Sequence, residues 1–473
     1  MLFNSYEFIF IFLPLTFFIY FYLNSKRLTK LSKLFLVFSS LFFYSWWNIN
    51  YLPLIVLSIV VNFFIGEYIY QKKYLLAVGI IFNLGLLGYF KYMDFFIENI
   101  NYIFNSRLEL LNLALPLAIS FYTFQQIAYI VDSYKGETKE YNFLDYAVFV
   151  TFFPQLIAGP IVHHADMMPQ FNNSKNMIKS YKNISMGLFI FAIGLFKKVA
   201  IADSFAIYAS KGFDVADKLN MIDGWITSLS YTFQLYFDFS GYTDMAIGIA
   251  LLFNIKLPYN FNSPYKATSI QDFWRRWHIT LSDFLKRYLY IPLGGNRVSE
   301  GRTYLNLFVT FLLGGVWHGA GWTFVFWGFL HGGALVVHRF WQRVGFGLNS
   351  IVAWFITFNF INISWVFFRA KEWSDAIKVL DGMLFGDIIL PTPFSSQLDF
   401  LGVEFGKWSK IFYGSYEIFL WIIGGFIVSL AVKNSMELKD GFKPTPLYMI
   451  WTILSLMSIF ILYRKSEFIY FNF

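Results

Sequence analysis

Long apolar runs separated by short charged loops dominate this chain and constrain its fold more than any other feature. A helix needs about 20 apolar residues to cross a bilayer, and fewer where protein shields part of it. The runs that meet this measure lie near 8–24, 34–48, 51–70, 74–90, 110–131, 142–158, 184–203, 225–253, 303–316, 320–338, 350–368, 416–433 and 446–463. Because several are short or interrupted, we expect about 11–13 spanning or re-entrant helices.

Charged residues are too few for a soluble fold of this length. Hydrophobic residues make up 57% of the 473 and charged residues 14%, whereas a soluble domain has roughly a quarter charged residues. In a bilayer, lipid covers the apolar surface instead. We therefore expect an all-α, polytopic transmembrane protein embedded in the lipid bilayer. The net charge of +8 is typical of basic cytoplasmic loops, and we expect no nucleic-acid partner.

Basic residues orient the first spans. The first apolar run lacks a basic leader and a small-residue cleavage site, and four basic residues follow it between 26 and 33. It is therefore interpreted as a retained span rather than a signal peptide. The loop 24–33 and Lys72–Lys73 are predicted to be cytoplasmic, which places the N-terminus outside. The lysines between 175 and 182 would also fall outside if 142–158 crossed fully, so either that segment is re-entrant or one span is miscounted.

Two stretches do not fit simple spans. Residues 154–172 contain three prolines, and residues 271–290 carry too many charges. Irregular backbone at membrane depth is tolerated only beside protein or a water-filled cavity, so both indicate a cavity. The 3.6-residue period of 271–290 predicts one amphipathic helix that lies in the interface or dips into the protein. His278 falls at the edge of its apolar stripe, where a partly dry setting lowers the pKa of a histidine and keeps it available as a base.

Histidines are the natural acid/base candidates, because the chain has six of them and no cysteine. The absence of cysteine excludes disulfides, thiolate metal sites and cysteine nucleophiles. His318 stands out among glycines at 314, 315, 319 and 321. These glycines either allow close helix packing or leave room for a substrate. His331 is predicted to be structural or to support the site from behind.

Other polar groups leave alternatives open. His163 and His164 could bind a metal, but neighbouring histidines on a regular element do not easily converge on one ion, and Asp166 is the only carboxylate nearby in the sequence. We therefore expect no metal site. Asp238 and Asp244 lie inside an apolar run, where they are either functional or paired with an arginine of the 271–290 helix.

Five motifs occur together in this chain. They are LPLAISFYTFQQIAYIVDSYKG (115–136), FFPQLIAGPIVHHADMMPQF (152–171), FDFSGYTDMAIG (237–248), FWRRWHITLSDFLKRYLYIPLGGNR (273–297) and GGVWHGAGWTFVFWGFLHG (314–332). In this order they resemble the membrane-bound O-acyltransferase family, and within it the bacterial membrane subunits that O-acetylate alginate or peptidoglycan.

The resemblance implies a fold and a site. It implies one transmembrane domain over 1–473 with a central tunnel, made of N-terminal helices (1–105), a catalytic core (110–340) and C-terminal helices (341–473). The WHG motif matches the family's histidine at His318, and the FWRRWH motif matches its second histidine at His278. Expected substrate-binding residues are Trp274, Arg275, Arg276, Trp317 and Trp322.

The resemblance also implies an activity. An acetyl group would pass from cytoplasmic acetyl-CoA across the bacterial inner membrane to an extracytoplasmic polysaccharide, either peptidoglycan or an alginate-type polymer. A separate extracytoplasmic acetyltransferase of the SGNH-hydrolase type would complete the transfer, and no bound cofactor is expected. Arg275, Arg276, Lys286 and Arg287 would attract the phosphates of CoA or, alternatively, face lipid headgroups.

Two other classes of function remain as alternatives. A polar-substrate transporter or flippase predicts internal repeats and charge pairs within the membrane. A structural subunit of a glycan-export complex predicts that no single residue is essential.

Overall fold

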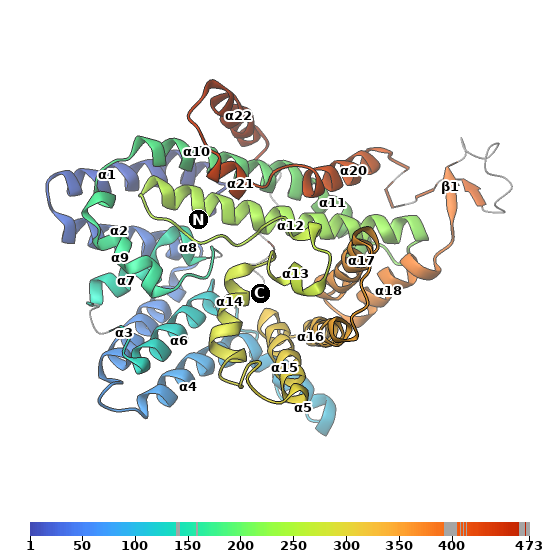
Figure 1. Cartoon of the computed structure of the whole chain (residues 1–473), viewed down its shortest axis with the longest axis horizontal. Coiled ribbons are helices and arrows are strands. Elements are labelled where there is room, and N and C mark those ends of the chain that lie inside the picture. The colour runs from blue at the N-terminus through green and yellow to red at the C-terminus, as the bar shows by residue number, and fades with distance from the viewer. Residues whose placement is uncertain are drawn as a thin grey trace.

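The computed structural model describes the chain except residues 139–141, 158, 392–403, 407, 410, 413, 463–468 and 470–473. Helices form nearly all of its regular structure (Figure 1), so the expected polytopic helical architecture is confirmed. One short parallel pair of strands, β1 (Ile389–Pro391) and β2 (Glu404–Gly406), is the exception within the described ranges.

The helices follow the predicted apolar runs in the first part of the chain, except that residues 110–118 of the predicted run 110–131 are not helical. These helices are α1 (Leu13–Ser25), α2 (Thr29–Ser45), α3 (Leu52–Tyr68), α4 (Leu75–Leu87), α5 (Met93–Phe104) and α6 (Ile119–Lys135). A π-helical turn, η1 (Phe8–Phe12), precedes α1, and a second one, η3 (Gly88–Tyr92), joins α4 to α5. The predicted end at residue 90 is therefore wrong, because the helical path continues to Phe104.

The remaining helices complete the molecule. They are α7 (Phe143–Thr151), α8 (Phe153–Leu156), α9 (His164–Asn172), α10 (Tyr181–Phe196), α11 (Asp203–Ser210), α12 (Met221–Leu252), α13 (Ile270–Trp274), α14 (Ile279–Leu285), α15 (Glu300–His318), α16 (Trp322–Val344), α17 (Ser350–Arg369), α18 (Trp373–Phe385), α20 (Glu417–Leu430), α21 (Ser435–Asp440) and α22 (Pro446–Leu456). Five helical segments of the described chain are long and apolar enough to cross a membrane. They are Phe8–Ser25, Ile49–Tyr68, Leu75–Phe104, Tyr181–Val215 and Ser350–Arg369.

The described residues 142–157 form no helix long enough to cross a bilayer. α7 has nine residues and α8 has four, so at about 1.5 Å per residue neither approaches the 30 Å or so of a hydrocarbon core. This favours the re-entrant interpretation. Lys33 holds α7 and α9 beside α2, since its ammonium lies 2.6 Å from Asp145 Oδ1 and donates to Asn172.

α12 runs through the centre of the molecule, with α10 alongside it (Figure 1). Glycines allow this contact, because a Cβ at Gly194 would lie 2.5 Å from the Gly241 carbonyl oxygen. A π-helical turn, η5 (Lys197–Ala202), follows α10 and carries the partners of the two buried aspartates. Lys197 lies 2.7 Å from Asp244, and Lys198 lies 2.7 Å from Asp238.

Of the two alternatives left open for these aspartates, the structure shows pairing, but the partners are lysines of η5 and not an arginine of 271–290. The charges on η5 come from a neighbouring helix, which reaches the aspartates through the close contact between α10 and α12. A transporter predicts internal repeats and charge pairs within the membrane, and these buried pairs meet the second of the two expectations.

Residues 271–290 do not form one helix. α13 ends at Trp274, α14 begins at Ile279, and a π-helical turn, η8 (Lys286–Tyr290), follows. His278 lies at the break with φ 44°, a left-handed conformation that costs a non-glycine residue free energy. The predicted continuous helix is wrong, although the segment does remain too short to cross. The tunnel and the three-part division of the chain stay predictions.

Candidate active site

His318 is the last residue of α15 and lies among three aromatic side chains, Trp317, Trp327 and Phe368, which we call the aromatic enclosure. Its side chain is buried, and its ring centroid lies 4.9 Å from Trp317, 5.0 Å from Trp327 and 5.0 Å from Phe368. These residues come from three helices, α15, α16 and α17. Aromatic walls exclude bulk water and strengthen any electrostatic interaction made within them.

His278 is fully buried at the break between α13 and α14. Its Nδ1 lies 3.2 Å from Asn260 Oδ1, and Phe239 of α12 packs edge-on with centroids 4.8 Å apart. Burial lowers the pKa of His278 to about 3. The expected lowering is confirmed, and the imidazole is neutral at physiological pH.

The two histidines lie in one region of the core. His318 is close enough to His278 and to His331 to interact with both electrostatically. Trp365 of α17 connects their surroundings, with ring centroids 5.0 Å from Trp277 and 5.7 Å from Trp327. Residues 40 apart in the sequence are thus brought to one place.

Trp274 supports this region through His331. Its indole N–H donates to His331 Nδ1 at 3.1 Å, and His331 Nε2 lies 3.0 Å from Ser364 Oγ. Because Nδ1 accepts, the proton of the neutral ring is on Nε2 and points to Ser364. The indole N–H of Trp274 is therefore bonded to the buried side chain of His331.

The two other tryptophans differ in position. Trp317 is buried and stacks on Phe124 with centroids 4.8 Å apart. Trp322 is 55% exposed at the start of α16, where its N–H donates to Asn99. Trp322 therefore faces away from the aromatic enclosure, and a role in substrate binding stays a prediction for both residues.

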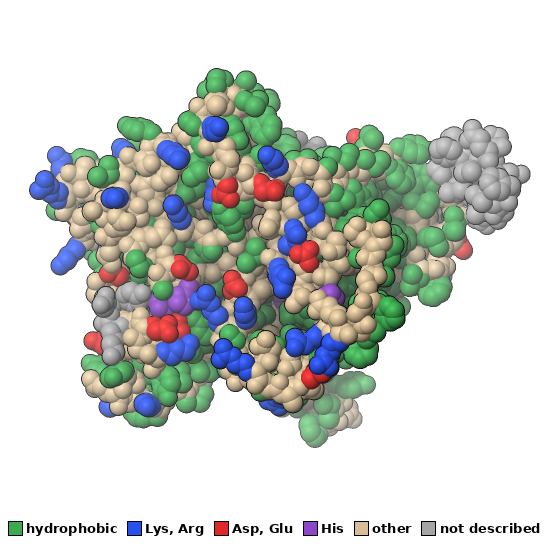
Figure 2. All heavy atoms as spheres, viewed as in Figure 1, with side chains coloured by type: hydrophobic (Ala, Val, Ile, Leu, Met, Phe, Trp, Pro, Cys, Tyr) green, Lys and Arg blue, Asp and Glu red, His purple; other side chains and the backbone are tan. Residues whose placement is uncertain are grey.

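The predicted arginines lie at the surface near α13. Arg276 pairs with Asp272 at 2.9 Å, and Arg275 is exposed and interacts electrostatically with His338. Figure 2 shows Lys and Arg side chains gathered over α13, α14 and α15. A cavity of about 640 Å³ lies in this area, and its basic lining residues are Lys286, Arg297, His338 and Arg339.

Two of the four glycines around His318, Gly315 and Gly319, leave no room for a side chain. A Cβ at Gly315 would lie 2.4 Å from the Phe324 carbonyl oxygen and 2.8 Å from the Cα of Gly328. At Gly319 it would lie 2.2 Å from the Phe324 ring. Of the two interpretations that the sequence left open, the structure supports close packing between α15 and α16.

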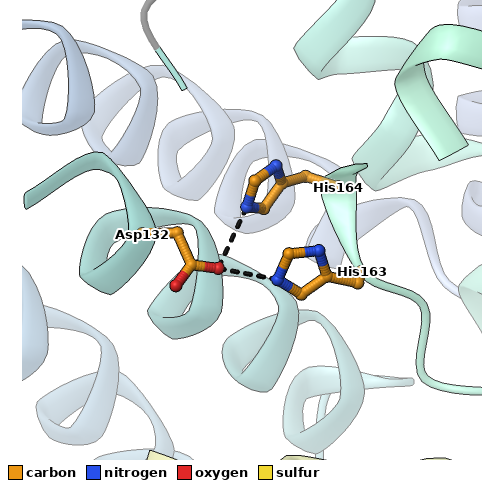
Figure 3. A group of neighbouring side chains, drawn as sticks. All are labelled: Asp132, His163 and His164. Carbon is orange, nitrogen blue, oxygen red and sulfur yellow. Dashed lines mark hydrogen bonds and ion pairs between the residues drawn. The ribbon is translucent and has the colours of Figure 1, made fainter. Parts of the chain in front are cut away.

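A second histidine cluster surrounds Asp132 (Figure 3). His163 Nε2 and His164 Nε2 lie 2.7 Å and 3.0 Å from Asp132 Oδ2, and Tyr288 donates to the same oxygen at 2.6 Å. The expectation that neighbouring histidines do not converge is wrong. His163 precedes α9 in extended backbone and His164 begins the helix, so the regular spacing of a helix does not separate them.

The protonation of His163 decides what this cluster holds. The three ligand atoms lie within 4.8 Å of one another, a spacing that permits a metal ion. However, the Ala165 backbone N–H donates to His163 Nδ1 at 3.2 Å. The proton of the neutral ring therefore sits on Nε2, which makes that nitrogen a donor to Asp132 rather than a metal ligand. Hydrogen bonds account for the arrangement, and the absence of a metal stays a prediction.

Sequence reasoning missed several residues of the site. Trp327 and Phe368 complete the enclosure of His318, and Asp132 joins the second cluster. Lys91 donates to the Trp317 and His318 carbonyl oxygens. Its one signal in the sequence was a lysine directly after the apolar run 74–90, since a charge at membrane depth usually has a function or a specific partner.

Together these features define a polytopic helical membrane protein with a buried pair of histidines in an aromatic core. The family model of the MBOAT, membrane-bound O-acyltransferase family, matches residues 9–370. The chain belongs to this family, and it is an O-acyltransferase. The resemblance seen in the motifs is confirmed.

Individual relatives extend the match to the whole chain. A peptidoglycan O-acetyltransferase from Helicobacter pylori is 52% identical, over 100% of this chain and 98% of its own. A probable alginate O-acetylase, AlgI, from Azotobacter vinelandii is 41% identical, over 85% of this chain and 82% of its own. A teichoic acid D-alanyltransferase from Streptococcus thermophilus is 28% identical, over 56% of this chain and 70% of its own.

Proposed function

We propose that this O-acyltransferase takes acetyl from cytoplasmic acetyl-CoA for O-acetylation of an extracytoplasmic polysaccharide, from a position in the bacterial inner membrane. The observation that carries the proposal is the enclosure of His318 by Trp317, Trp327 and Phe368, with His278 in the same region. A site that excludes bulk water protects a reactive acyl group from hydrolysis.

His318 acts as the general base. Its imidazole takes the proton of an acceptor hydroxyl, the hydroxyl oxygen attacks the thioester carbonyl, and the carbon–sulfur bond breaks to release CoA thiolate, which takes up the proton. Alternatively, the imidazole nitrogen attacks the thioester carbonyl first, the carbon–sulfur bond breaks to release CoA thiolate, and the acetyl group is held as an acyl-imidazole. The acceptor hydroxyl then attacks this acetyl group, the carbon–nitrogen bond breaks, and the hydroxyl proton ends on the released CoA thiolate. In both routes, His278 orients the reacting groups or stabilises the developing charge.

Two indole groups are available to hold the substrate. Among the described residues, the N–H groups of Trp317 and Trp327 have no hydrogen-bond acceptor, although both side chains are buried. Buried donors are nearly always paired in proteins. A thioester carbonyl oxygen beside His318 would supply the acceptor, and this supports substrate binding at Trp317 and adds Trp327.

The basic cavity near α13 supports entry of CoA from the cytoplasmic side. Its lining residues include Lys286, Arg297 and Arg339, which match the phosphates of a nucleotide. Leu307 of α15 also lines it, and the 11 residues from there to His318 rise about 16 Å along the helix. An extended pantetheine arm covers a comparable distance, so phosphates in the cavity would place the thioester near His318.

The acceptor proposal follows the relatives. Identity to a peptidoglycan O-acetyltransferase is 52% over the whole chain, against 41% over 85% for the alginate O-acetylase. We therefore favour peptidoglycan over alginate as the final acceptor. A separate extracytoplasmic acetyltransferase of the SGNH-hydrolase type would receive the acetyl group from this chain.

Purified protein with radiolabelled acetyl-CoA tests the proposal. The wild type should cleave the thioester or transfer acetyl to an acceptor glycan, and His318→Ala should reduce turnover by at least about 100-fold. His278→Asn should reduce turnover while the protein remains folded. Lys175→Ala, an exposed lysine far along the chain from the site, is the matched control. Wild-type turnover in His318→Ala would overturn the catalytic assignment.

A second measurement tests the donor cavity. Arg297→Ala combined with Arg339→Ala should raise KM for acetyl-CoA about tenfold, since each charge-assisted bond to phosphate is lost. An unchanged KM would mean that these cations face lipid headgroups. The buried ion pairs between η5 and α12 leave transport as a second candidate. Glycan movement across vesicles without acetyl turnover would favour it.

A further inference from the structure

The end of α15 has an unusual set of partners. The last carbonyl groups of a helix lack intrahelical donors and need others. Tyr92 OH donates to the Val316 carbonyl oxygen at 2.7 Å, and Lys91 Nζ donates to the carbonyl oxygens of Trp317 at 2.6 Å and His318 at 3.2 Å. Two consecutive residues of one helix thus satisfy the backbone that carries His318.

The ammonium of Lys91 is fully used by the protein. It also donates to Ser120 Oγ of α6 at 3.1 Å and lies 5.7 Å from the centroid of the Trp317 ring. An ammonium has three N–H donors, and these three bonds account for all of them. Lys91 is therefore not a donor to the substrate. Its positive charge complements the partial negative charge at the C-terminal end of α15.

The local backbone presents both residues to the same target. Lys91 and Tyr92 lie in η3, the π-helical turn between α4 and α5. Such turns insert a residue into an α-helix and occur often at functional sites. The helical path Leu75–Phe104 is otherwise apolar enough to cross the membrane, so a lysine in it needs a specific partner.

We propose that Lys91 and Tyr92 are positioning residues that fix the orientation of His318. The inference rests on the proposed function, in which His318 is the reacting group. The pair holds the backbone of residues 316–318, and the ring of His318 is joined to that backbone through a single Cβ atom. A displacement of about 1 Å at a reacting group can reduce the rate about 100-fold. Loss of the pair should therefore reduce kcat and leave the distant donor cavity intact.

Lys91→Met and Tyr92→Phe remove the donors one at a time. For Lys91→Met, kcat should fall about 100-fold while KM for acetyl-CoA changes less than about twofold. Tyr92→Phe loses a single neutral hydrogen bond and should show a smaller fall in kcat. Lys91→Arg keeps the charge and the donors and should retain more activity than Lys91→Met.

Because the chain has no cysteine, Lys91→Cys would carry the sole thiol. Alkylation of this thiol with 2-bromoethylamine restores an ammonium at the length of a lysine, whereas bromoethane adds only the hydrocarbon. Lys91 is partly accessible, and mass spectrometry reports how complete each reaction is. Aminoethylation should restore kcat and ethylation should not. Wild-type protein treated with both reagents is the control.

The outcomes separate the inference from the proposed function. Full kcat in Lys91→Met, or no recovery after complete aminoethylation of Lys91→Cys, would overturn the positioning role. Should Lys91→Met fail to fold, the recovery of the cysteine variant decides. Turnover that survives in His318→Ala would overturn the proposed function itself. An inactive His318→Ala beside a fully active Lys91→Met would overturn the positioning role alone.

Discussion

The close contact between α15 and α16 predicts a sharp response to one methyl group. Gly315 of α15 faces α16, and a Cβ placed there lies 2.4 Å from the Phe324 carbonyl oxygen and 2.8 Å from the Cα of Gly328. Both neighbours are backbone atoms, so a change of rotamer relieves neither contact. In Gly315→Ala the two helices have to separate.

The size of the separation follows from these distances. Ordinary van der Waals contact begins at 3.4 Å, so a contact at 2.4 Å requires a shift of about 1 Å. Overpacking of this kind costs about 1–3 kcal/mol of folding free energy. His318 lies one helical turn from Gly315, and a shift of about 1 Å there can reduce the rate about 100-fold. We therefore expect a modest loss of stability and a large loss of turnover.

Thermal unfolding in detergent and acetyl-CoA turnover measure the two effects separately. Gly333→Ala on α16 and Gly301→Ala on α15 are matched controls, because a Cβ at either position meets nothing within 4 Å. Both controls should keep wild-type turnover, and alanine should stabilise each helix slightly. Wild-type turnover and melting in Gly315→Ala would refute the packing argument, since they would show that α15 and α16 accommodate the methyl group without separating.

Two further substitutions test the charged groups. In the wild type, the Lys198 ammonium lies 2.8 Å from Asp203 and 2.7 Å from Asp238. Lys198→Met removes this cation and leaves both carboxylates buried, so we expect the free energy of unfolding to fall by about 3–5 kcal/mol in thermal melts. A fall below about 1 kcal/mol would contradict this expectation. In Asp132, burial opposes ionisation, but hydrogen bonds from His163, His164 and Tyr288 prevail and hold the pKa of the carboxyl well below its usual range. This stabilisation is complete above the unfolded pKa of about 4 and is lost as pH falls through the lower folded pKa. The melting temperature of Asp132→Asn should therefore lie below that of the wild type by a constant difference at pH 5–7, and this difference should shrink below about pH 4. A difference that shrinks already at pH 6 would contradict the assignment of the stabilisation to the Asp132 carboxyl.

Apolar runs predicted most of the helices, since the bilayer demands length and hydrophobicity at each crossing. The prediction failed where a charge interrupts a run. The predicted span that begins at residue 74 ended at residue 90, because the charged residues Lys91, Asp94 and Glu98 follow. In the structure the helical path continues to Phe104, since Lys91 finds its acceptors on α15 and α6. Contacts with distant segments of this kind leave no local pattern.

The sequence allowed the two histidines of the site to be predicted, but not how they are arranged in space. The motifs marked His318 and His278, but the period of 271–290 predicted one helix through His278. The break arises from Asn260, whose Oδ1 accepts from the Thr280 backbone and hydroxyl at 3.2 Å and 2.9 Å. These two bonds join residues 20 apart, and they hold the chain directly after the left-handed backbone of His278. Trp327 and Phe368 likewise reach His318 from helices that follow it in the chain.

The ion pairs between η5 and α12 also bear on how the protein is made. Asp238 and Asp244 lie within a long buried helix, α12, and their lysines lie midway along the preceding helical segment, Tyr181–Val215. A charge without a partner is costly in the hydrocarbon region. If α12 entered the bilayer alone, both carboxylates would meet lipid. Lys197, Lys198 and the glycine contact at Gly194 and Gly241 instead favour insertion of the two segments as a preformed hairpin, so that the translocation machinery releases a pair already neutralised.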